Sequence, residues 1–228
     1  MKYLRSAIYF FIFVLSSNSV SAQRSEIGFG LGTFNYTGDL AKNYDFLNSK
    51  PAGTIFYRSN LSKVVSFRTA ITAGKIGASD KRPVDAFAAQ RGASFNLFLL
   101  ELSTVLEYHF LNWRDNKHMI RFTPYLFGGL ALFGMTGNNS KPEEYSNVQG
   151  AIPFGLGFKY IYNPKWYFSL EFGPRKTFFD YLDNVSVGRQ NNKNYQYGNP
   201  FNNDAYYFLG ITLTHTFYEI PCPTNPYK

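Results

Sequence analysis

The feature that most constrains the fold is a strict alternation of uncharged and polar residues over 98–110, FLLELSTVLEYHF. The even-numbered positions of this run are all uncharged: Phe98, Leu100, Leu102, Thr104, Leu106, Tyr108 and Phe110. Glu101 and Glu107 fall on the odd-numbered side with Ser103 and His109. Successive side chains of a β-strand point to opposite faces, so both glutamates share one face. A buried carboxylate needs cationic or hydrogen-bonding partners, and the opposite face needs apolar surroundings.

The same period-two pattern recurs at 27–36, 65–75, 152–160, 166–173 and 207–217, and two further segments, 51–61 and 119–134, are apolar on both faces. Together with 98–110, these segments predict eight strands. The content of Phe (24), Tyr (18) and Gly (19) also favours sheet over helix. Pro124, Pro153 and Pro174 fall inside these segments, where a soluble central strand would not tolerate them. No repeat or linker divides residues 23–228, which indicates one domain.

The connections between the predicted strands alternate in length. Short ones cover 60–63, 111–118 and 162–166, and long ones cover 36–50, 75–95, 135–149 and 176–204. This segregation is typical of bacterial outer-membrane proteins. We therefore predict an all-β, eight-stranded, antiparallel up-and-down transmembrane β-barrel with short periplasmic turns and long extracellular loops. The alternative is a secreted sandwich or lipocalin-like barrel, which requires polar residues where the chain has Phe98 to Phe110.

The N-terminus predicts export. Lys2 and Arg5 precede an apolar run at 7–15, and SVSA at 19–22 ends in a small-residue cleavage site. The expected division is a signal peptide at 1–22, the barrel at 23–220 and a periplasmic tail at 221–228. The apolar run is shorter than the roughly 20 residues of a membrane-spanning helix. The predicted location is the outer membrane of a Gram-negative bacterium, with membrane lipid as a partner.

The polar faces of the strands are expected to line a plugged interior, because side chains fill an eight-stranded barrel. The predicted ion-pair network consists of Arg58, Arg68, Glu101, Glu107, Arg121, Lys159, Glu171 and Arg175. Glu101 and Glu107 are expected to pair with Arg121 and Arg68 on the neighbouring strands. Glu171 is expected to pair with Arg175 or Lys159. Inward glycines at 28, 30, 32, 155 and 157 would make room for these long side chains.

Aromatic residues at the strand ends predict two girdles. The inner, periplasmic girdle comprises Tyr57, Tyr108, Phe110, Trp113, Tyr160, Tyr162, Trp166, Phe217 and Tyr218. The outer girdle comprises Tyr36, Phe133, Phe178 and Tyr206.

No motif favours an enzyme. The three histidines, His109, His118 and His215, lie near the predicted short turns, and Ser103 is too far from His109 along a strand to share a hydrogen bond. We find no metal-ligand spacing, nucleophile motif or phosphate-binding loop, so no catalytic residue, cofactor or metal is predicted. The net charge of +8 is not gathered into a basic run, which argues against nucleic acid as a partner.

Two ends of the mature chain resemble a known family. The segment EIGFGLGTFNYTGDL (26–40), with Asn35, Tyr36, Gly38 and Asp39, and the closing YEIPCPTNPYK (218–228) resemble the PorG-like outer-membrane barrels of the type IX secretion system in Bacteroidetes. The resemblance covers most of the mature chain in layout and is specific at these two ends. It implies a non-enzymatic barrel associated with a periplasmic ring of the PorK lipoprotein and PorN, in protein export.

The expected partner-binding residues lie at the periplasmic end: Trp113, Arg114, Lys117, Lys165 and Cys222. Trp113 beside Arg114 is a pair found at interfaces, and Trp113 also suits a membrane girdle. Cys222 is the single cysteine, so it is either an idle thiol or, given the ring, one half of an interchain disulfide. The alternative function is a small barrel whose extracellular loops, such as the Tyr- and Asn-rich 176–204, bind lipid, host or matrix ligands.

Overall fold

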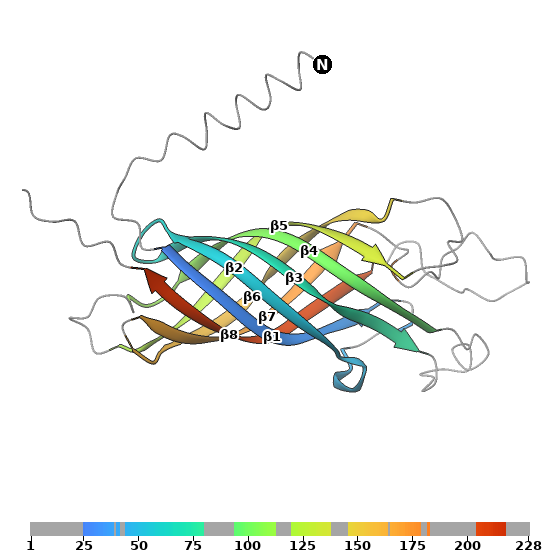
Figure 1. Ribbon diagram of the computed structural model, residues 1–228, viewed down its shortest axis with the longest axis horizontal. Coiled ribbons are helices and arrows are strands. Elements are labelled where there is room, and N and C mark those ends of the chain that lie inside the picture. Colours follow the sequence, from blue (N-terminus) through green and yellow to red (C-terminus); the bar gives the residue numbers. More distant parts are fainter. Residues whose placement is uncertain are drawn as a thin grey trace, which may run out of the picture.

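The computed structural model describes residues 25–38, 40–41, 44–79, 94–112, 120–137, 146–163, 165–178, 182 and 204–217. Within them, eight antiparallel strands close into a tilted barrel (Figure 1). The strands are β1 (Ser25–Thr37), β2 (Lys50–Asn60), β3 (Val65–Ser79), β4 (Ser94–His109), β5 (Phe122–Thr136), β6 (Val148–Ile161), β7 (Trp166–Thr177) and β8 (Ala205–Phe217). A short 3₁₀ helix, η1 (Phe46–Asn48), lies between β1 and β2. The predicted fold class is confirmed.

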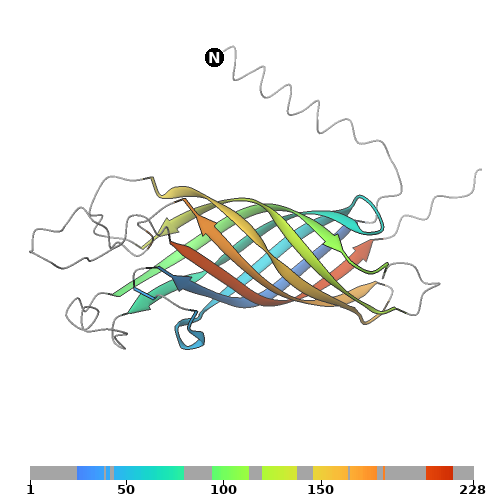
Figure 2. The same ribbon diagram turned by 180° about the vertical axis from the view of Figure 1, so that it is seen from behind.

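Each strand pairs with its neighbours in sequence, and β1 pairs with β8 to complete the wall (Figure 2). The closing seam runs from Ser25 opposite Phe217 to Thr37 opposite Ala205. Both termini of the barrel therefore lie at one end. The connections 61–64, 110–121 and 162–165 join the strands at this end, and the connections 38–49, 80–93, 137–147 and 178–204 join them at the other. The connection 110–121 is as long as 38–49, because β5 begins three residues later than predicted.

The outer surface of the barrel is apolar. Leu31 is 77% exposed, Leu130 68% and Ile211 61%, and most outward positions of the eight strands carry similar side chains. The inward positions alternate with them and are buried. They include nearly all the charged residues of the strand interiors. A surface of this kind is stable only in apolar surroundings, because the hydrophobic effect disfavours so large an apolar patch in water.

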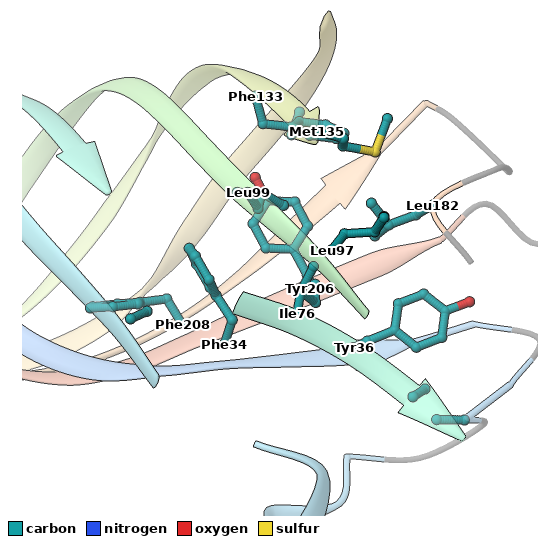
Figure 3. Packing of buried hydrophobic residues seen from close by; sticks show 14 of the residues in the cluster. Phe34, Tyr36, Ile76, Leu97, Leu99, Phe133, Met135, Leu182, Tyr206 and Phe208 are labelled. Atoms are coloured by element: carbon teal, nitrogen blue, oxygen red, sulfur yellow. The ribbon is translucent and has the colours of Figure 1, made fainter. Parts of the chain in front are cut away.

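The half of the interior nearest the long connections is filled by an apolar cluster. Phe34, Tyr206 and Phe208 pack edge to face, with Phe133 against Tyr206 (Figure 3). Leu182, from the connection after β7, is fully buried in the same cluster. Side chains thus close this half of the lumen.

The predicted outer girdle is wrong at three of its four positions. Tyr36, Phe133 and Tyr206 are at most 1% exposed and belong to the interior cluster, while Phe178 is 68% exposed. Tyr36 and Tyr206 share the parity of the inward glycines in their strands, so the alternation directs them to the lumen. At the short-turn end, Tyr57, Tyr108, Phe110, Tyr160, Tyr162, Trp166 and Phe217 are exposed as expected of a girdle. Trp113 and Tyr218 lie outside the described residues.

Candidate functional site

The ionic interior is centred on Glu107 of β4. Its Oε1 lies 3.0 Å from Arg58 Nη2 and 3.1 Å from Arg68 Nε, and its Oε2 lies 3.0 Å from Arg58 Nε and 2.6 Å from Lys159 Nζ. The carboxylate therefore bridges cations from β2, β3 and β6. Glu107, Arg58 and Lys159 are fully buried. In such surroundings the ion pairs are strong only as a complete set, because each desolvated charge needs its partners.

Glu26 of β1 extends this network. Its Oε2 accepts hydrogen bonds from Arg58 Nη1 at 2.9 Å and from the Tyr167 hydroxyl, and its Oε1 accepts from Asn60 Nδ2 at 2.6 Å. The Asn60 Oδ1 in turn accepts from Ser66 at 2.8 Å. Glu26 is absent from the predicted network, although it shares the parity of Gly28 and Gly30. It is 1% exposed, so it belongs to the interior.

Glu171 of β7 binds Arg68 from the opposite wall. Arg68 Nη1 lies 2.5 Å from Glu171 Oε2 and Nη2 lies 3.1 Å from Oε1, a bidentate pair. The Tyr125 hydroxyl donates to Oε2 at 3.0 Å. The expected partners of Glu171, Arg175 and Lys159, are replaced by a side chain that crosses the lumen.

Glu101 is the centre of a second, smaller group of polar contacts, which lies nearer the long connections than Glu107 does. Its Oε2 accepts from Arg175 Nε at 3.2 Å and from the Tyr206 hydroxyl at 2.7 Å. Arg175 also donates to the Gly173 carbonyl at 2.5 Å. Since Tyr206 belongs to the apolar cluster, its hydroxyl joins the two halves of the interior.

His109 is buried beside Lys159 near the short-turn end. Lys159 Nζ lies 2.6 Å from His109 Nε2, and His109 Nδ1 lies 3.1 Å from the Val64 carbonyl oxygen. A carbonyl only accepts, so we assign the proton to Nδ1, which leaves Nε2 to accept from the ammonium. The imidazole is then neutral and serves as a further ligand of Lys159. Alternation places His109 on the same face of the strand as Glu107, and this parity is the signal in the sequence that indicates its inward position.

Aromatic rings flank the guanidinium groups. Arg58 lies 4.7 Å from the centroid of the Phe56 ring, and Arg68 lies 5.4 Å from the same ring. A Cβ at Gly28 would lie 2.2 Å from the Phe56 Cζ, and one at Gly157 would lie 2.4 Å from the Tyr125 Cζ. These inward glycines thus accommodate rings rather than the charged chains, which corrects the expectation.

One predicted member of the network is wrong. Arg121 precedes the first residue of β5, is exposed, and accepts from the Ile161 amide through its backbone carbonyl at 2.8 Å. Because β5 begins at Phe122, Arg121 lies outside the strand and its side chain does not enter the lumen. It is therefore not a partner of Glu101 or Glu107. When Arg121 is left out and Glu26 is included, the buried acidic and basic residues of the strands are equal in number. The acids are Glu26, Glu101, Glu107 and Glu171, and the bases are Arg58, Arg68, Lys159 and Arg175.

Of the predicted partner-binding residues, only Lys165 belongs to the described residues. It is exposed in the turn between β6 and β7, where its amide donates to Asn163 Oδ1 at 3.0 Å. Trp113, Arg114, Lys117 and Cys222 lie outside the described part of the chain. Among the described residues, no helix is long and apolar enough to span a bilayer, and no group of three His, Cys, Asp or Glu side chains is placed to hold a metal ion.

A closed antiparallel barrel with an apolar exterior and an ionic interior is the arrangement of an integral outer-membrane protein. Neisserial surface protein A (NspA) has the same fold, with a TM-score of 0.53 and 11% identity over 86% of this chain and 98% of that chain. The protein is a small outer-membrane β-barrel, as its sequence predicts. By sequence, it belongs to the family described as a domain of unknown function, DUF6089, which matches residues 5–225.

Two further barrels show weaker structural similarity. Ail, the attachment invasion locus protein of Yersinia pestis, is 10% identical with a TM-score of 0.48, over 86% of this chain and all (100%) of that chain. OprG of Pseudomonas aeruginosa is 10% identical with a TM-score of 0.43, over 87% and 97%. No curated protein matches the sequence significantly.

Proposed function

We propose that this protein is a non-enzymatic outer-membrane barrel of the type IX secretion system that anchors the periplasmic ring of PorK- and PorN-type subunits. The observation that carries the proposal is the filled, charge-balanced interior. A lumen closed by paired ions in one half and aromatic rings in the other leaves the two ends of the barrel to contact partners. The sequence resemblance at 26–40 and 218–228 supports docking of the ring at the periplasmic end and the role in export.

The charge at the periplasmic end supports a docking surface there. Within the described residues, the exposed charged side chains at this end are Lys63, Arg121 and Lys165, all basic. The acids of the adjacent strands, Glu26 and Glu107, are buried in ion pairs and do not offset them at the surface. Such a surface favours an acidic partner through electrostatic steering and specificity.

Deletion of the gene tests the role in export. An anchor of the secretion ring predicts that all type IX cargo with a C-terminal sorting domain fails to reach the surface. Normal export combined with loss of one binding activity would instead favour the alternative, a barrel whose extracellular loops bind lipid, host or matrix ligands.

Charge reversal tests the docking surface. The double variant Arg121→Glu, Lys165→Glu is expected to reduce co-purification of PorK and PorN with the barrel. Lys75→Glu is the matched control, because Lys75 is an exposed, outward lysine in the half of β3 nearest the long loops. Equal recovery of the ring with both variants would contradict a basic periplasmic contact.

Cys222 is proposed to form an interchain disulfide with a ring subunit. Non-reducing gels of cell envelopes are expected to show a reducible, larger species that disappears with Cys222→Ser. Identical mobility of the two proteins would identify Cys222 as an idle thiol and leave the anchoring role to be judged by the deletion.

A further inference from the structure

The connection between β1 and β2 lies against the outside of the barrel wall. We call residues 44–49, which contain η1, the β1–β2 foot. Tyr44 contacts Phe172 of β7 and Tyr207 of β8 edge to face, at 6.0 and 5.4 Å between ring centroids. Phe172 and Tyr207 alternate with the inward residues of their strands, so their rings lie on the exterior. In Figures 1 and 2 the foot is a short coil outside the wall.

Hydrogen bonds fix the foot to the wall and within itself. Asn35 is an outward residue of β1, yet it is only 1% exposed, because the foot covers it. Its Nδ2 donates to the Asp45 carbonyl at 2.5 Å and to Ser49 Oγ at 3.1 Å. Asp45 caps η1 by accepting from the Leu47 amide at 2.9 Å. The foot is therefore a defined structure rather than a loose loop.

This fixed turn presents two large apolar side chains outward. Phe46 is 72% exposed and Leu47 is 74% exposed, close to the 77% of Leu31 in the apolar belt of the barrel. Phe46 also contacts Tyr44, at 4.9 Å between ring centroids. Two such residues held side by side on an ordered turn are unfavourable in water and favourable in a hydrocarbon environment.

The position of the foot along the wall indicates what surrounds it. On the outer face of β7 and β8, paired residues follow one another toward the long-loop end. The pairs are Leu170 with Ile211, Phe172 with Leu209, Pro174 with Tyr207, and Lys176 with Ala205. The wall changes there from aliphatic to aromatic to charged, and this order marks the boundary between acyl chains and headgroups.

We propose that the β1–β2 foot is a lipid-binding element, with Phe46 and Leu47 inserted among the acyl chains of the outer leaflet just below the headgroups. Its apolar surface is continuous with the belt through Phe172 and Tyr207, which form a stacked pair 5.8 Å apart beneath Tyr44. The foot then widens the lipid contact over the β1–β8 seam at the extracellular side. This role is independent of the proposed export function.

Fluorescence of a single tryptophan tests the proposal on the full barrel in phosphatidylcholine vesicles. Trp113 and Trp166 are first replaced by Phe, and Phe46→Trp or Leu47→Trp is then introduced. Both probes are expected to emit at blue-shifted wavelengths and to lose intensity when the lipid is brominated near the glycerol end of its chains. Lipid brominated near the methyl end should quench them less. Ile211→Trp in the middle of the belt is the control and should show the reverse depth preference.

Release of the foot supplies a second, independent measurement. Asn35→Ala removes both hydrogen bonds to the foot and leaves Phe46 and Leu47 unchanged, so it is expected to reduce the quenching of Phe46→Trp by brominated lipid. The vesicles contain no partner protein, so failure here does not bear on the export role. The proposal is overturned if both foot tryptophans emit as in water, are quenched by aqueous acrylamide and are insensitive to bromine, while Ile211→Trp responds.

Discussion

Arg58 and Arg68 are directly opposite each other on β2 and β3, and the Glu107 carboxylate contacts both. Two like charges in register on one face of a sheet repel, so this pair is stable only with an acid against it. Lys159 on Glu107 Oε2, Glu26 on Arg58 and Glu171 on Arg68 complete the set. The network links β1, β2, β3, β4, β6 and β7 across the lumen, which ties opposite walls together.

Removal of the central acid should destabilise the barrel strongly. Glu107→Gln leaves Arg58, Arg68 and Lys159 short of one counter-charge, and an uncompensated buried charge costs about 3–5 kcal/mol. Urea-induced unfolding in vesicles, followed by the loss of heat-modifiable gel mobility, measures this free energy. Glu101→Gln is the control with one ion-pair partner, Arg175, and is expected to lose less. Equal losses for the two variants would contradict a central role for Glu107.

The geometry of Arg68 should matter as well as its charge. Arg68→Lys keeps the charge but cannot form the bidentate pair with Glu171 and the contact with Glu107 together. We expect the free energy of unfolding to fall by about 1.5–3 kcal/mol, the range for hydrogen bonds to charged groups. Arg121→Lys makes the same substitution at an exposed position and should change it by less than about 0.5 kcal/mol. Comparable effects at both sites would contradict the specific role of the guanidinium.

Alternation alone predicts much of this architecture. It identifies six of the eight strands, the apolar exterior and the inward positions of Arg58, Arg68, Glu101, Glu107, Lys159, Glu171 and Arg175. It fails at Arg121 because parity continues past the end of a strand, and where β5 begins depends on its pairing with β4 and β6. Glu26 has the parity of Gly28 and Gly30, but it lies one residue before the predicted first strand, 27–36, so the predicted network omits it. In the structure β1 begins at Ser25 and includes Glu26.

The ion-pair partners were harder to predict than the faces. The expected pairs joined acids to bases on the same or an adjacent strand, and the structure has one of them, Glu107 with Arg68. Arg68 of β3 also binds Glu171 of β7, however, and Lys159 of β6 binds Glu107 of β4. In a barrel of eight strands, long side chains reach across the lumen, so partners are determined by the closed shape rather than by neighbouring pairs. The foot was missed for a similar reason. Its contacts with β7 and β8 depend on the β1–β8 seam, and the sequence places Tyr44 and Tyr207 far apart.

Two glycines of β6 allow a test of how tightly the interior of the barrel is packed. Gly157→Ala places a Cβ 2.4 Å from the Tyr125 ring, which also binds Glu171. Overpacking of this kind costs about 1–3 kcal/mol, so we expect a lower urea midpoint. Gly150→Ala in the same strand is the control, because a Cβ there has no atom within 4 Å. If Gly157→Ala is tolerated as well as Gly150→Ala, the ring is not held tightly at this glycine.

The filled interior also predicts how the barrel behaves in a planar bilayer. The ionic half is paired and buried, and the other half is closed by Phe34, Phe208 and their neighbours, so no continuous water path is expected. Purified protein should insert without a steady ohmic current. The double variant Phe34→Ala, Phe208→Ala opens space only in the apolar half of the lumen. Because the Glu107 network still fills the other half, the barrel of this variant should remain closed to ions. A stable conductance of the unmodified protein would contradict the closed lumen, and conductance of the double variant alone would mean that the aromatic cluster, rather than the ion pairs, forms the seal.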